Sequence, residues 1–161
     1  MVALIVLAGC GSQNTTPTPD RPSQSVGPSD VPSTNPRLLA FRTHMADAIA
    51  RDGELIRNLA VAIASSPAQA KAVIKEIAVW TAAETAWLKK NPPLACYKEA
   101  HDSLRAGVAD IAAANTQFSK LMASKSPPKS LGSTPAGARL AQGASEINKA
   151  RALARDNGSC A

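Results

Sequence analysis

The hydrophobic residues downstream of residue 36 follow helical spacing. In the clearest segment, seam positions recur alternately four and three residues apart, which is typical of a helix that packs against partner helices. No stretch there shows the strict alternation typical of a β-strand. The pattern therefore predicts an all-α fold. The members of this seam are Tyr97, His101, Leu104, Val108, Ile111, Asn115, Phe118 and Met122.

Helix starts are marked by a capping residue followed by proline, at Asn35-Pro36, Ser66-Pro67 and Thr134-Pro135. The side-chain oxygen of the capping residue accepts a hydrogen bond from a free N–H of the first turn, and proline has no N–H to lose. A fourth start follows Asn91-Pro92-Pro93, and Asn157-Gly158 is typical of a helix stop. We expect four helices, near residues 37–64, 67–90, 94–124 and 135–156.

The other three segments carry seams of unequal strength. Short connections between the first three helices favour antiparallel neighbours, so we predict an up-down-up-down four-helix bundle. Trp80 and Trp87 should pack in its core, and the Ala-rich fourth helix should leave a groove beside it. The seam members are Leu38, Phe41, Met45, Ile49, Asp52, Ile56, Leu59 and Ile63 in the first helix, Val73, Ile77, Trp80, Glu84 and Trp87 in the second, and Leu140, Ala144, Ile147 and Leu153 in the fourth.

Three polar residues within these seams are candidates for a site. Counted outward from the turn near Pro92, Glu84 and His101 fall at about the same level, and Asp52 lies about one turn further along. Buried charge without a partner is costly, so we expect Glu84 and His101 to form a hydrogen-bonded pair that fixes helix register. The alternatives are a metal or proton-handling site formed by Asp52, Glu84 and His101, and plain exposure of these side chains.

Residues 11–36 have a different composition, with proline set among Ser, Thr, Asn and Gln and almost nothing apolar. Such a segment cannot offset its ordering entropy by burial, so we expect a disordered linker. As a flexible coil of about 26 residues, it would span roughly 30 Å on average.

The N-terminal apolar run closes with Leu7-Ala8-Gly9-Cys10, which resembles a bacterial lipobox. The resemblance implies that Leu7, Ala8 and Gly9 are recognised by the signal peptidase, that residues 1–9 are removed, and that Cys10 is lipidated. Secretory signals normally open with positive charge and are longer, so we expect the true start upstream of Met1. Residues 10–36 would then be a lipid-anchored linker and residues 37–161 an extracytoplasmic domain on a bacterial membrane.

The chain contains three cysteines, Cys10, Cys96 and Cys160. One is assigned to lipid, and an exported protein resides where disulfides persist, so we expect Cys96 and Cys160 to be bonded to each other. In the predicted bundle, the start of the third helix and the end of the fourth lie at the same end, which agrees with this pairing. The alternative is two free thiols.

The formal net charge is +6, but the basic residues are scattered along the sequence and only Lys89 and Lys90 are adjacent. Aromatic residues for base stacking are few, so we do not expect a nucleic-acid partner. We interpret the charge as a mildly basic surface that favours an anionic surface, such as lipid headgroups or wall polymers.

Three classes of function stay open at this point. The tether and the helical domain favour a lipid-anchored binding or interaction module of the cell envelope, with an envelope protein or an anionic surface as partner. A metal- or cofactor-carrying bundle is the second class, although the Glu-x-x-His pairs of iron-carboxylate bundles and the Cys-x-x-Cys-His of covalent haem are absent. An enzyme is the third. We expect neither a catalytic site nor a cofactor.

Overall fold

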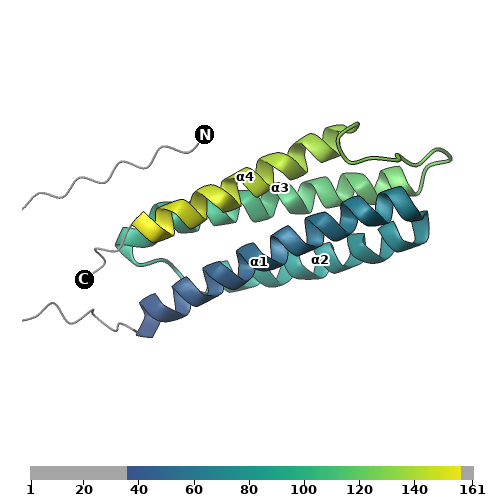
Figure 1. Ribbon diagram of the computed structural model, residues 1–161. Coiled ribbons are helices and arrows are strands. Elements are labelled where there is room, and N and C mark those ends of the chain that lie inside the picture. The colour runs from purple at the N-terminus through teal and green to yellow at the C-terminus, as the bar shows by residue number, and fades with distance from the viewer. Residues whose placement is uncertain (1–35, 157–161) are drawn as a thin grey trace, which may run out of the picture. The chain divides into compact units, whose positions relative to one another are not determined.

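The computed structural model describes residues 36–156, with the side chains of residues 36–154. Within this range there are four α-helices and no strand, so the predicted all-α four-helix bundle is confirmed (Figure 1). A short 3₁₀ helix precedes the third α-helix. The elements are α1 (Pro36–Ser65), α2 (Pro67–Lys90), η1 (Ala95–Tyr97), α3 (Lys98–Met122) and α4 (Pro135–Asp156).

The helix bounds agree with the predicted ones to within a few residues, and the caps predicted for α2 and α4 form; α3 begins at Lys98 without a side-chain cap, and Asn91 instead ends α2. The Ser66 hydroxyl accepts a hydrogen bond from the Gln69 N–H at 3.2 Å, and the Thr134 hydroxyl accepts one from the Gly137 N–H at 3.0 Å. Asn35 and the stop at residues 157–158 lie outside the described residues. The same holds for the lipobox, the linker and Cys160, so the anchor and the disulfide stay predictions.

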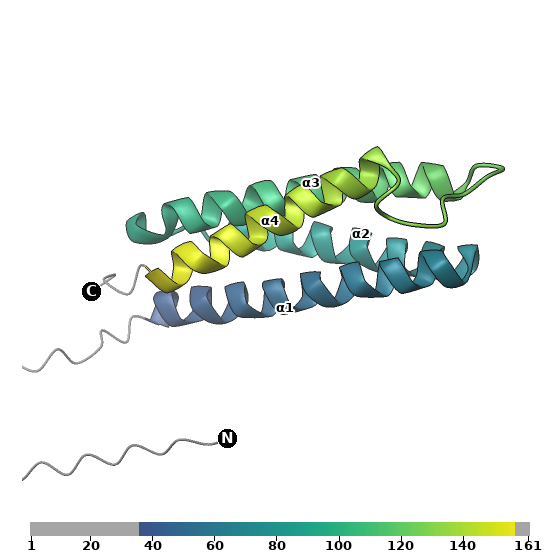
Figure 2. The same cartoon turned by 45° about the horizontal axis from the view of Figure 1, so that its top comes forward.

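The helices alternate in direction, and each packs against its neighbours along the chain, with α4 returning to contact α1 (Figure 2). The start of α1, the end of α2, the start of α3 and the end of α4 therefore share one end of the bundle, which we call the Pro36 end. The opposite end, where α1 turns into α2 and α3 leads into α4, is called the Ser66 end. Cys96 lies in η1 at the Pro36 end, where α4 also finishes.

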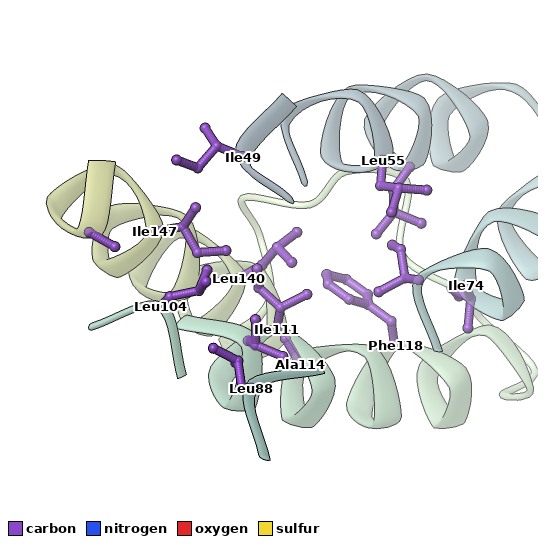
Figure 3. Packing of buried hydrophobic residues seen from close by; sticks show 14 of the residues in the cluster. Ile49, Leu55, Ile74, Leu88, Leu104, Ile111, Ala114, Phe118, Leu140 and Ile147 are labelled. Atoms are coloured by element: carbon purple, nitrogen blue, oxygen red, sulfur yellow. The ribbon is translucent and has the colours of Figure 1, made fainter. Parts of the chain in front are cut away.

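The core is built from seams on all four helices that point into a common interior (Figure 3). The predicted seam of the third helix is buried in full. The seam predicted for α2 is confirmed at Ile77 and Glu84, but Val73, Trp80 and Trp87 are only partly buried, each one position before a buried residue. The buried seam of α2 consists of Ala70, Ile74, Ile77, Thr81, Glu84 and Leu88.

The pair α3 and α4 has the most extensive contacts in the bundle, and two glycines explain why. A Cβ atom added to Gly107 of α3 would lie 2.7 Å from the Gly143 carbonyl oxygen, and one added to Gly143 of α4 would lie 2.9 Å from the Gly107 carbonyl oxygen. Each added Cβ would also meet an isoleucine of the facing helix, Ile147 or Ile111. Only residues without side chains permit the backbones to approach this closely.

We predict that Gly107→Ala lowers the free energy of unfolding by about 2 kcal/mol, because the added methyl group meets backbone that cannot give way. Gly53→Ala is the matched control, since its Cβ would approach nothing closer than 3.4 Å, from the end of the flexible Arg57 side chain. The control should be neutral or stabilise the helix, by up to about 1 kcal/mol. Urea unfolding followed by circular dichroism measures both. Equal effects of the two variants would contradict the close crossing.

Candidate functional site

The three polar seam residues singled out from the sequence are all buried, with Asp52 at 5 %, Glu84 at 7 % and His101 at 6 % exposure. The alternative that they are exposed is therefore wrong. The expected pairing is also wrong, because Glu84 bonds to His44 rather than to His101. The three residues do not share hydrogen bonds with one another.

His44 of α1 is held between two residues of α2. Its Nε2–H donates to the Glu84 carboxylate at 2.7 Å, and its ring stacks on the Trp87 indole with centroids 3.5 Å apart and planes 8° from parallel. Glu84 and Trp87 are three residues apart and so lie on adjacent positions of one helix face. This arrangement gives the buried carboxylate a partner and joins α1 to α2. His44 lies beside the seam rather than in it, which is why the seam pattern did not identify it.

His101 belongs to an aromatic cluster around Phe41 at the Pro36 end. Its Nε2 lies 3.3 Å from the Leu88 carbonyl oxygen, to which the ring N–H donates, and its ring centroid lies 6.1 Å from that of Phe41. Phe41 also contacts Trp87 and Tyr97, and the Tyr97 hydroxyl accepts a hydrogen bond from Arg42 at 2.7 Å. The role of His101 in this arrangement is to join α2 and α3 within the core.

Asp52 is the buried acid that lacks a compensating partner. Its Oδ1 has no hydrogen-bond partner among the described residues, and burial raises the pKa of its carboxyl group to about 6. The indole N–H of Trp80 is likewise buried without a partner. Asp52 is thus a strained polar position of α1 rather than a member of a charged network.

The described part of the chain contains no group of three or more His, Cys, Asp or Glu side chains placed to hold a metal ion. Glu84 and His44 could together move a proton, since a carboxylate that accepts from one imidazole nitrogen orients the ring. His44 has 22 % of its side chain exposed, so solvent reaches the pair only at its edge.

The most distinctive feature of the surface is the distribution of charge between the two ends. Residues 55–75 and 111–145, which form the Ser66 end, contain seven Lys or Arg and no Asp or Glu. The remaining residues of 36–154 contain nine basic and nine acidic residues. The basic residues of the first group define what we call the cationic end. They are Arg57, Lys71, Lys75, Lys120, Lys125, Lys129 and Arg139.

Basic residues scattered along the sequence are therefore gathered by the fold. All seven side chains of the cationic end are exposed, and only Arg139 forms an ion pair, with Asp110 at 3.1 Å, among the residues the structure describes. At the Pro36 end, in contrast, pairs such as Lys98 with Asp102 neutralise one another. The positive potential is consequently concentrated on one end of the bundle.

A second surface feature lies between α1 and α4, the neighbouring α-helices with the fewest contacts. Here a groove of about 620 Å³ is lined by Met45, Ala46, Ile49 and Ala154, with Arg42 and Arg151 at its rim. The groove expected beside the Ala-rich fourth helix is thus confirmed. Small side chains on α4 leave it uncovered, as the sequence predicted.

None of the helices in the described range is both long and apolar enough to cross a membrane. No protein-family model, curated protein or solved structure matches the chain.

We predict that His44→Leu lowers the free energy of unfolding by about 2 kcal/mol or more, because Glu84 would be left buried without a partner. The double variant His44→Leu with Glu84→Leu should recover much of that loss. His44→Gln is the conservative control, since its amide can still donate to the carboxylate. Denaturant unfolding of the wild type and the three variants gives the free energies of unfolding for this comparison. A neutral His44→Leu would contradict the pair.

We predict that Asp52 contributes a fall in stability as the pH rises from about 4 to about 7. The folded-state pKa of about 6 lies above the unfolded value near 3.9, so the folded protein holds this proton more tightly. The resulting stabilisation is complete below pH 4 and is lost as the pH passes through 6. Asp52→Asn should reduce the fall by on the order of 1–2 kcal/mol.

The control for this prediction is Asp47→Asn, at an exposed position of the same helix. Urea midpoints are measured at pH 4.5 and pH 7.5 for the wild type and both variants. A pH dependence unchanged by Asp52→Asn, or changed equally by Asp47→Asn, would refute the assignment.

Proposed function

We propose that the protein is a lipid-anchored binding module of the bacterial cell envelope, which captures an anionic polymer with its cationic end. The observation that carries this proposal is the charge distribution: the whole cationic excess of residues 36–154 lies at the Ser66 end. Exposed like charges repel one another, so gathering six that form no ion pair among the described residues costs stability. An anionic partner would offset that cost.

The geometry of the bundle supports a partner away from the anchor. The segment that follows Cys10 joins the bundle at Pro36, and the cationic end is at the far end of α1. The 30 residues of α1 correspond to a rise of about 45 Å. With the cationic end at the far end of α1 from Pro36, the domain reaches a polymer without turning back on its linker toward its own membrane, so we favour a polymer of the envelope over the lipid surface.

The binding half of the proposal predicts that the full chain binds inorganic polyphosphate, and that affinity falls steeply with salt. Replacing the six unpaired basic residues of the cationic end by glutamine should weaken binding by at least about a hundredfold at low salt. The measurement is anisotropy of a labelled polyphosphate. The control is Lys89→Gln, Lys90→Gln and Lys149→Gln, which removes exposed lysines outside the cationic end and should weaken binding only slightly. The proposal would be refuted if the wild type did not bind polyphosphate. It would also be refuted if the control variant lost as much affinity per charge removed as the variant of the cationic end.

The anchor half predicts that Cys10→Ala, in a chain expressed with a complete signal sequence, moves the protein from the membrane to the soluble fraction. Two acyl chains on one cysteine suffice for stable anchoring, and without them no other firm attachment is proposed. Detergent partitioning and fractionation measure the change, with Cys96→Ala as the matched control. Unchanged partitioning of the Cys10 variant would rule out the lipoprotein assignment.

A further inference from the structure

A groove of about 440 Å³ opens between α2 and α3 within the cationic end. Lys71 and Lys75 of α2 contribute to one side and Lys120 of α3 to the other, and none of these three forms an ion pair in the described part of the chain. Thr116 and Ser119 of α3 also line it. The groove therefore combines three cationic donors with neutral polar groups.

Asn115 lines the same groove and is incompletely satisfied. The residue is 6 % exposed, and its Nδ2 donates to the Ile74 carbonyl oxygen at 2.9 Å. Its Oδ1 has no hydrogen-bond partner among the described residues. A buried amide oxygen without a donor is unfavourable by an amount comparable to a hydrogen bond. Asn115 thus places an unused acceptor beside the three lysines of the groove.

The two kinds of group indicate the chemistry of the ligand. Lysine ammonium groups only donate and bind phosphate as point charges. The Asn115 oxygen can only accept, and Thr116, whose hydroxyl donates to the Ala112 carbonyl at 3.0 Å, keeps its lone pairs for a donor. A ligand that carries negative charge and hydroxyl groups side by side matches both sets.

We propose that the α2–α3 groove binds a polyol phosphate, with Lys71, Lys75 and Lys120 on its phosphates and Asn115 accepting from a hydroxyl. This inference rests on the proposed function, since it specifies the repeating unit of the anionic polymer and the site at which the cationic end binds it. A glycerol phosphate chain is the simplest polymer of this chemistry. The phosphatidylglycerol headgroup shares it, but the distance of the cationic end from Pro36 favours the polymer.

The first experiment compares two triple variants that remove equal charge from the same end. Lys71→Gln, Lys75→Gln and Lys120→Gln alter the groove, whereas Arg57→Gln, Lys125→Gln and Lys129→Gln alter positions that do not line it. Titration of the full chain with poly(glycerol phosphate) should show a loss of about tenfold to a hundredfold for the groove variant and under about threefold for the other. Equal losses would overturn the groove assignment and leave the proposed function standing. No binding by the wild type would refute both.

The second experiment uses the same polymer with its hydroxyl groups methylated, which keeps the charge and removes the donors. The wild type should bind the unmodified polymer about fivefold more tightly, the contribution of one hydrogen bond. Asn115→Leu should bind both polymers equally. If circular dichroism shows that Asn115→Leu does not fold, the double variant Thr116→Val with Ser119→Ala replaces it. This double variant should reduce the difference in affinity between the unmodified and the methylated polymer. Equal binding of both polymers by the wild type would overturn the polyol assignment. Binding to phosphatidylglycerol vesicles is measured in parallel, and tighter binding to the vesicles than to the polymer would overturn the choice of polymer.

Discussion

The arrangement of the bundle depends on how closely α3 and α4 approach at Gly107 and Gly143. A Cβ atom on either glycine would occupy the space that the backbone of the other helix fills. Ser103, Ala114 and Ala150 are further small residues buried on these two helices, and α3 contacts both α4 and α2. The weakly hydrophobic α4 is held mainly by this contact, because its contacts with α1 are few and leave a groove.

The helices and their order could be predicted from the sequence, whereas the polar contacts could not. Seam spacing and proline caps locate the helices because both are local signals. The phase of α2 was missed because its large tryptophans lie at the seam edge, while the small Ala70 and the polar Thr81 occupy the seam itself. Glu84 belongs to the predicted and to the observed seam alike, but its partner is His44, at an edge position of α1 that the seam spacing does not mark.

The charge distribution is the second feature that the sequence concealed. Along the chain, basic residues look scattered because the cationic end is assembled from four separate helical segments and one loop. In an antiparallel bundle, the second half of one helix and the first half of the next lie at the same end. Residues 55–75 and 111–145 each span such a connection and contain no Asp or Glu, so the fold brings them together as one cationic surface. Outside the cationic end, His44, Glu84 and His101 each form a hydrogen bond within the bundle, whereas Asp52 and Trp80 keep buried polar atoms without partners among the described residues. The two ends thus differ in chemistry, one closed by aromatic packing and one left with unpaired cations.

The central claim is that the protein works through its cationic end, and mapping of backbone amide chemical shifts tests it most directly. The full chain is labelled with ¹⁵N and titrated with a short oligo(glycerol phosphate). The account predicts that the perturbed amides lie in the first turns of α2, the last turns of α3 and the loop that follows it. Perturbations centred on Arg42 and Arg151, at the groove between α1 and α4, would contradict it.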